Sequence, residues 1–469
     1  MPPYPASSAI AAGPQARADL GTPTTDLSNA ERFAADHSIN VRHHHESGWY
    51  AYDSGTWRRN EALVADLAQK TVRMIYEEAA ACEDPKERKL LASWAQKSES
   101  ARAISAILQL ARSDALIRID PKQFDSDHWL LNCRNGVVEL RTGKLRQHEQ
   151  LDYMTKQAPV DYKPGAEHPT WTRFLDTMLP DLELREFVQK AAGYSLTGDT
   201  SCEVLFFVYG PTRSGKSTFT GALKACLGDY STTANFESFL AKRDRDSRNS
   251  MAALWGARLV VSLEVDRGRT FAAALVKAVT GMDSIKAMFK YREEFEYTPT
   301  WKLWLVANDR PKADSEDDAL WRRMIVLPFD HSLPANEQDP AVKETLFNDP
   351  SARQAILSWA VQGCMKWIAS DRRLTPPESV TQAVSDYREG CDDLSAFFDE
   401  CCEFDPKAET ASSDILSACK KWCEENSIRE PWGQDVAARL KKKGCEPART
   451  AGRKRTWIGI ALKATDMFS

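Results

Sequence analysis

The chain has 469 residues, a formal net charge of -5 at pH 7, and ordinary globular proportions of 42% hydrophobic and 28% charged residues. This length exceeds what one hydrophobic core usually supports, so we expect two or three domains. The charge balance excludes a histone-like protein covered in positive charge, although a local basic groove can still hold nucleic acid. No apolar run is long enough to span a bilayer. The 11 cysteines form no even, closely spaced framework, which favours a reducing cytoplasm.

The first part of the chain predicts a tail followed by an α+β domain. Residues 1–25 are rich in Ala, Pro, Ser, Thr and Gly without periodicity and predict a flexible tail. Apolar residues then recur at helical spacing over residues 60–112. Shorter runs follow, separated by Asn135-Gly136 and Thr142-Gly143, which is typical of hairpins. We therefore expect an α+β, helicase-associated domain over residues 26–194.

A different pattern begins with the continuous apolar run at residues 204–209. Such a run suits a strand that is buried on both faces of a mostly parallel sheet. Similar runs occur at residues 259–261, 303–306 and 324–327, with helix-compatible stretches between the first three. The pattern predicts an α/β motor over residues 195–332. A helical extension over residues 333–393 and a small terminal domain over residues 394–469 are expected to follow it.

A nucleotide-binding motif follows the first of these strands. Residues 210–217 read Gly-Pro-Thr-Arg-Ser-Gly-Lys-Ser, which matches G-x-x-x-x-G-K-[ST] in the required strand-loop-helix context. The glycines let backbone N–H groups surround phosphate oxygens, Lys216 places a charge on the β/γ-phosphates, and Ser217 offers a hydroxyl to Mg²⁺. ATP and Mg²⁺ are thus the expected cofactors. The expected nucleotide-binding residues are Gly210, Pro211, Thr212, Arg213, Ser214, Gly215, Lys216, Ser217 and Thr218.

The later strands supply candidates for catalysis. Glu264 ends a strand that we expect to neighbour the P-loop strand, where it would polarise water, order Mg²⁺, or do both, with Asp266 as a possible helper. Asn308 ends the next strand, where its amide would hold the attacking water or sense the γ-phosphate. Arg322 and Arg323 precede the last strand. They would reach the nucleotide of a neighbouring subunit in a ring, unless they are merely surface arginines.

Two segments are candidates for contact with DNA. Residues 285–297 alternate and reverse, which predicts a hairpin whose tip, Lys290, Tyr291 and Arg292, suits the phosphates and bases of a single strand. The C-terminal domain is locally basic, although a solvated face without a partner is the alternative. Its expected DNA-binding residues are Lys441, Lys442, Lys443, Arg453, Lys454 and Arg455. The cysteines that crowd this domain have no His after His331 and no C-x-x-C, so buried thiols are favoured over zinc.

The order of these motifs resembles the superfamily 3 helicases, specifically the phage and plasmid primase-helicase family, in which a poxvirus-type N-terminal helicase domain precedes the motor. Residues 129–136, 140–143 and 192–198 carry the likeness in the N-terminal domain. The P-loop, Glu264, residues 275–277, residues 280–283, Asn308 and residues 321–323 carry it in the motor. The resemblance implies an AAA+-like P-loop core, a hexameric ring with ATP between subunits, a central DNA-binding hairpin and a winged-helix-like C-terminal domain. Met282 departs from the glycine that the family usually has there.

The resemblance also implies a function, namely an ATP-dependent DNA helicase of a phage, prophage or plasmid replication system in the cytoplasm of a bacterial host. Such a motor would translocate on single-stranded DNA and unwind forked duplex as a homo-oligomer without a membrane. A separate primase or other replication proteins would be partners, because only a short tail precedes the helicase domains and no primase site is expected in this chain. The alternative is a nucleotide-dependent replication initiator or scaffold that binds origin DNA without processive unwinding. Stimulation of ATP turnover by single-stranded DNA discriminates between catalytic and scaffolding roles.

Overall fold

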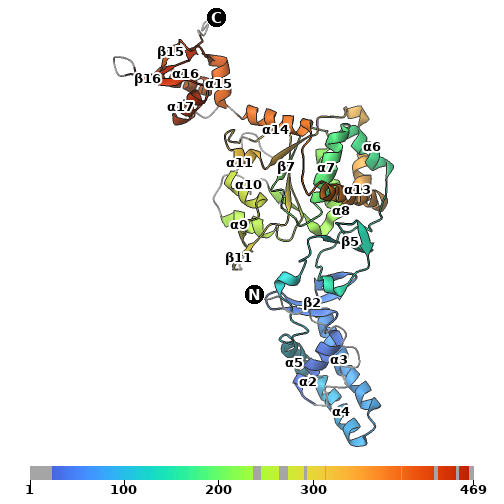
Figure 1. Ribbon diagram of the computed structural model, residues 1–469. Coiled ribbons are helices and arrows are strands. Elements are labelled where there is room, and N and C mark those ends of the chain that lie inside the picture. The colour runs from blue at the N-terminus through green and yellow to red at the C-terminus, as the bar shows by residue number, and fades with distance from the viewer. Residues whose placement is uncertain are drawn as a thin grey trace.

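The computed structural model describes residues 24–235, 245–263, 273–289, 293–311, 313–391, 393–426, 431, 433–449 and 454–463. The flexible tail expected over residues 1–25 lies outside this part of the chain, except for its last two residues. The described chain is elongated, with a helical N-terminal region at one end, the sheet with its helices in the middle, and a small C-terminal region at the other end (Figure 1). Within the described residues, no helix is both long and apolar enough to cross a membrane.

The N-terminal region combines helices with a three-stranded antiparallel sheet. Along its middle strand Trp49 and Ala51 are buried while Tyr50 and Tyr52 are only partly covered, so one face of the sheet packs on the helices. This arrangement agrees with the expected mixture of helices and hairpins. The elements are α2 (Asp26–His37), β1 (Val41–His44), β2 (Gly48–Asp53), β3 (Thr56–Arg59), α3 (Glu61–Ala81), α4 (Pro85–Ser98) and α5 (Ala101–Ala111).

A second antiparallel sheet and two helices lead into the centre of the molecule. The sheet consists of β4 (Leu130–Cys133), β5 (Gly136–Glu139) and β6 (Lys144–Arg146), and the helices are α6 (Pro169–Met178) and α7 (Leu182–Tyr194). Helix α7 packs directly on α13 (Pro350–Ala369). The two backbones approach so closely that a Cβ on Gly193 would lie 2.0 Å from the backbone nitrogen of Cys364. Both helices therefore belong to the core beneath the central sheet.

The central sheet has five parallel strands in the order β13-β7-β12-β9-β8. Alternate residues of β7 enter different cores, with Phe206 and Val208 on one side and Leu205 and Phe207 on the other. Burial on both faces explains why the sequence of this strand is continuously apolar. The strands are β7 (Leu205–Tyr209), β8 (Ser231–Asn235), β9 (Leu259–Leu263), β12 (Lys302–Ala307) and β13 (Met324–Pro328). The expected α/β core is thus confirmed.

Helices cover both faces of this sheet (Figure 1). One face packs on α6, α7, α13 and α8 (Lys216–Leu227). The other packs on α9 (Arg245–Ala252), α10 (Ala273–Thr280), α11 (Asp318–Trp321) and α14 (Glu378–Gly390). The short helix α12 (Pro340–Asn348) lies beside α8, and the hairpin of β10 (Ile285–Met288) and β11 (Glu294–Tyr297) lies beside α9. Because residues before 194 and after 333 share these cores, the domain boundaries drawn from sequence remain proposals.

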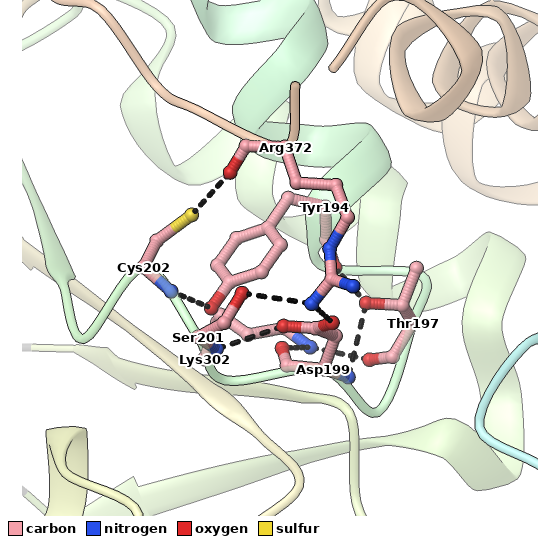
Figure 2. A network of polar contacts seen from close by, with 7 residues as sticks. All are labelled: Tyr194, Thr197, Asp199, Ser201, Cys202, Lys302 and Arg372. Atoms are coloured by element: carbon pink, nitrogen blue, oxygen red, sulfur yellow. Dashed lines mark hydrogen bonds and ion pairs between the residues drawn. The ribbon is translucent and has the colours of Figure 1, made fainter. Parts of the chain in front are cut away.

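Two buried cations at the amino-terminal edge of the central sheet bind neighbouring segments of the chain. The Lys302 ammonium donates to the carbonyls of Thr197 and Asp199 and lies 4.8 Å from the centre of the Tyr194 ring (Figure 2). The Arg258 guanidinium, just before β9, donates to the carbonyls of Leu130 and Leu196, at 2.8 Å each. Burial lowers the pKa of Lys302 from 10.5 to about 7. These bonds tie the segment that precedes β7 to the sheet.

The C-terminal region has its own small core, built around Phe397, Trp422, Leu440 and Trp457. Its elements are α15 (Asp393–Cys401), β14 (Cys402–Glu403), β15 (Glu409–Ala411), α16 (Ser412–Glu425), α17 (Gly433–Lys442), β16 (Glu446–Arg449), β17 (Arg455–Ile458) and β18 (Ala461–Leu462). Strands β15, β17 and β16 form an antiparallel sheet. Four of its cysteines are buried in this core, and the described residues contain no cluster of possible metal ligands.

Candidate nucleotide-binding site

The loop that connects β7 to α8 has the backbone shape that surrounds a phosphate. Gly215 has a φ of 79°, and a Cβ there would lie 2.8 Å from Cγ of Met178, so glycine is required on both counts. Helix α8 begins at the next residue, Lys216, and its first N–H groups have no partner within the helix. The helix dipole adds to the attraction for an anion. The loop and the helix end therefore form an anion site at the carboxyl edge of the sheet.

The Lys216 side chain lies inside this loop. Its ammonium donates to the carbonyl of Gly210 at 2.7 Å, to that of Pro211 at 2.6 Å, and to the hydroxyl of Ser214 at 3.2 Å. Burial lowers the pKa of Lys216. Phosphate oxygens would offer the ammonium a negatively charged acceptor in place of neutral carbonyls, which gives stronger hydrogen bonds. Ser217 and Thr212 are exposed, and Thr218 is partly covered.

The segment after β13 braces the loop, a feature that the sequence did not indicate. The backbone N–H of Phe329 donates to the carbonyl of Tyr209 at 2.7 Å, which continues the β13-β7 pairing to the loop. The hydroxyl of Ser332 donates to the carbonyl of Thr212 at 2.8 Å. No motif marks these positions, because the contacts depend on the chain direction after β13 rather than on particular side chains.

Asn308 emerges beside the loop, as expected. Strand β12 pairs with β7 so that Ala307 lies opposite Tyr209, and Asn308 is exposed at the same edge. Sequence analysis missed Arg310, whose guanidinium lies 4.4 Å from the centre of the Tyr209 ring and 5.4 Å from that of Tyr387. A cation-π contact of this kind is stronger when partly desolvated. The signal for it in the sequence was an arginine three residues beyond a strand end.

The position expected for Glu264 was partly wrong. Strand β9 ends at Leu263, and it pairs with β12 rather than with β7, so one strand separates it from the P-loop strand. The strand order, which no local pattern encodes, causes this difference. Glu264 and Asp266 themselves lie outside the described residues.

The two arginines lie at the other edge of the sheet. Strands β13 and β7 are parallel and Met324 is opposite Leu205, so Arg322 and Arg323 precede the amino end of β13. Arg323 forms an ion pair with Glu203 at 2.8 Å and donates to the carbonyl of Ala319. Arg322 is exposed. Both arginines were expected to have the same role, whereas the structure places them in different surroundings.

The expected hairpin is present, with Ile285 opposite Tyr297 and Met288 opposite Glu294. Lys290, Tyr291 and Arg292, the expected tip, lie outside the described residues. Next to them, the Phe289 and Phe295 rings stack at 5.4 Å. The hairpin is thus held by aromatic packing close to its turn.

The basic residues of the C-terminal region are not all free to face a partner. Lys442 pairs with Glu316 of the central region at 2.8 Å, and Lys443 pairs with Asp399 of its own region at 3.6 Å. Lys441 is exposed on α17, and Lys454 and Arg455 are exposed at the start of β17. Arg453 lies outside the described residues.

Comparisons with known proteins match the chain to two families and to viral proteins named as helicases. Residues 30–180 match the family described as D5 N terminal like, and residues 208–323 match a family of unknown function (DUF5906). The "Putative helicase L207/L206" of Acanthamoeba polyphaga mimivirus is 26% identical over 81% of this chain and 42% of that protein. The "Putative helicase 022R" of Frog virus 3 is 23% identical over 66% of this chain and 41% of that protein. A solved C-terminal region of NrS-1 aligns with 94% of this chain and 100% of that chain, at 8% identity and a TM-score of 0.45.

The parallel sheet and its glycine-shaped loop define an α/β protein with a P-loop-like core. The D5-type N-terminal match and the viral relatives named as putative helicases make the chain similar to D5-like primase-helicases. It spans less than half the length of the two relatives named above.

Proposed function

We propose that the chain is the ATP-dependent DNA helicase motor of a viral or plasmid replication system, and that it works as a ring in which neighbouring subunits share each nucleotide site. The observation that carries the proposal is the separation of the P-loop from Arg322. Strand β13 has 5 residues. At about 3.3 Å per residue, it places the two edges of the sheet roughly 16 Å apart. An arginine at one edge therefore serves a nucleotide at the other edge only in a neighbouring subunit, and a closed ring, here a hexamer, supplies that neighbour.

The chemistry assigned to the site follows from charge. Lys216 and the amino end of α8 would hold the phosphates of ATP, and Ser217 would contribute a ligand to Mg²⁺. The metal would neutralise charge on the β- and γ-phosphates, while Asn308 and Glu264 would orient the attacking water. Arg322 of the neighbouring subunit would stabilise the charge that develops during transfer.

The C-terminal region supports a DNA-binding role for the same motor. The order α15-β14-β15-α16-α17 followed by the β16-β17 hairpin resembles that of a winged helix, with the two-residue strand β14 as an addition. We propose a winged-helix-like domain there, with Lys441, Lys454 and Arg455 toward DNA phosphates and the β10-β11 hairpin toward single-stranded DNA. The relatives named above come from viruses of eukaryotes, so they do not support the bacterial host expected from sequence.

The test is ATP turnover with and without single-stranded DNA, together with strand separation of a forked duplex. Wild type should show both, and Lys216→Ala should lose both by about 100-fold or more, because a preorganised charge on the phosphates is removed. Lys224→Ala, on the same helix α8, is the matched control and should retain activity. Turnover without strand separation, combined with binding of duplex DNA, would favour the initiator or scaffold instead.

A further inference from the structure

Helix α17 presents two of its cations to the central region rather than to solvent. Arg439 and Lys442 are three residues apart, so they project from one face of the helix. Both donate to the same carboxylate oxygen of Glu316, Arg439 at 3.1 Å and Lys442 at 2.8 Å. The contact joins two regions that are more than one hundred residues apart in sequence.

Glu316 is held in place by the acidic segment around it, residues 314–318. Asp317 caps the amino end of α11 and pairs with Lys277 of α10 at 2.7 Å. Asp318 pairs with Arg388 of α14 at 2.6 Å. These neighbours fix the segment to the central region, while Glu316 reaches the C-terminal region. The segment leads directly into α11 and Arg322.

The contact between Glu316 and the two cations is weak enough to be broken by a competing anion. About 47% of the Glu316 side chain and 61% of the Lys442 side chain are exposed, so solvent and salt weaken the pair. The hydrogen bond from Lys442 holds the pKa of Glu316 below its usual range, which keeps the carboxylate ionised at neutral pH. A DNA backbone offers the same cations several phosphates at once, with release of counterions.

We propose that Glu316 occupies the place of a DNA phosphate, so that duplex DNA and the central region compete for Arg439 and Lys442. In the DNA-free protein the carboxylate covers these two cations. Bound duplex pairs with them instead and releases Glu316, so residues 314–318 lose one of their contacts close to the Arg322 turn. This proposal rests on the proposed DNA-binding role of the C-terminal region.

The first experiment measures duplex binding by the full-length protein with fluorescence anisotropy at several salt concentrations. Glu316→Gln should bind about threefold to tenfold more tightly than wild type, because the competitor loses its charge. Glu337→Gln removes another exposed carboxylate, for which no side-chain contact is seen in the described part of the chain, and should leave affinity unchanged. Equal affinities of wild type and Glu316→Gln would overturn the competition.

A second variant separates this inference from the function on which it rests. The double change Lys454→Gln, Arg455→Gln should weaken duplex binding whatever Glu316 contacts, because these two exposed cations at the start of β17 are not the ones that pair with Glu316. If the double change has no effect, DNA binding by the C-terminal region fails. If it weakens binding while Glu316→Gln has no effect, only the competition fails.

Amide hydrogen exchange measures the opening of this contact directly, and a general change in DNA affinity would not alter it in the same way. Adding duplex to wild type should slow exchange in α17 and speed exchange over residues 314–318, because the two segments part. In Glu316→Gln the acidic segment should exchange fast before DNA is added. Continued protection of residues 314–318 in the DNA-bound wild type would show that the contact stays closed and would refute the proposal.

Discussion

The charged side chains at the two edges of the central sheet have different surroundings. At the carboxyl edge, the loop after β7 leaves the first N–H groups of α8 unpaired within the helix, and the acceptors of Lys216 in the described part of the chain are neutral. At the amino edge, Lys302 and Arg258 are buried and each is satisfied by backbone carbonyls. At the carboxyl edge the polar groups can bind a ligand, whereas at the amino edge they form structural hydrogen bonds.

This contrast shows why a cation's burial alone does not identify a site. Lys216 and Lys302 are both buried and both have a lowered pKa. What differs is the structure around them, because the Lys216 loop faces the open strand ends whereas Lys302 is enclosed by Tyr194 and the 197–199 segment. At the amino edge, buried cations hold the sheet to neighbouring segments, and Arg322 is proposed to serve the nucleotide of a neighbouring subunit.

The largest effect is expected for Arg322→Ala. Ring ATPases lose about 1000-fold or more in turnover when a charge-stabilising arginine is removed, so ATPase activity should fall by that order while ATP binding remains. Arg323→Ala is the matched control, since its guanidinium is already paired with Glu203. Steady-state ATPase assays and nucleotide titration measure both. A larger loss for Arg323→Ala would reverse the assignment.

A mixture of two inactive proteins should recover part of the activity. Lys216→Ala lacks the phosphate charge and Arg322→Ala lacks the arginine, so a mixed ring contains some interfaces with both residues intact. ATPase activity should rise when the two are mixed and should depend on their ratio. Labelled subunits must first be shown to exchange. No recovery in rings that exchange freely, even for single-site turnover, would exclude action between subunits.

Lys302→Met should lower the free energy of unfolding, because the carbonyls of Thr197 and Asp199 lose their hydrogen-bond donor. A buried acceptor left without a donor costs about 1–3 kcal/mol. The loss should also depend on pH. The pKa of Lys302 is about 7 when folded and 10.5 when unfolded, so between these values the unfolded chain binds more protons and wild-type stability rises with pH.

The variant lacks this rise, so its deficit relative to wild type should grow by about 2 kcal/mol from pH 7 to pH 9. Urea unfolding followed by tryptophan fluorescence at several pH values measures the difference. Lys163→Met, at an exposed lysine, is the control and should show no such trend. A deficit that is constant with pH would mean that Lys302 stays charged throughout this range.

The smallest effect is expected for the stability of Arg323→Ala. Its ion pair with Glu203 is partly exposed, and such pairs contribute about 0–1 kcal/mol. The urea midpoint should therefore shift only slightly. A large shift would show that Arg323 is a main support of the amino edge, beside Lys302 and Arg258.

Much of the site was predictable because its signals are local. The spacing of Gly210, Gly215 and Lys216 needs only the strand before it and the helix after it, and both are present. The β10-β11 hairpin and the basic end of α17 followed from alternation and composition in the same way. The surroundings of Arg322 and Arg323 were not predictable, because Glu203 reaches Arg323 from 120 residues away.

The sequence by itself determined the parallel α/β core, the phosphate loop and the positions of strand ends, since each depends on residues that are neighbours along the chain. Only the tertiary structure decided that β12 separates β9 from β7, that Lys302 and Arg258 close the amino edge, and that Glu316 meets α17. These features depend on strand order and on contacts across more than fifty residues. These contacts are stabilised by burial and by pairing between residues that are distant in sequence, and the periodicity of the sequence does not predict such pairs.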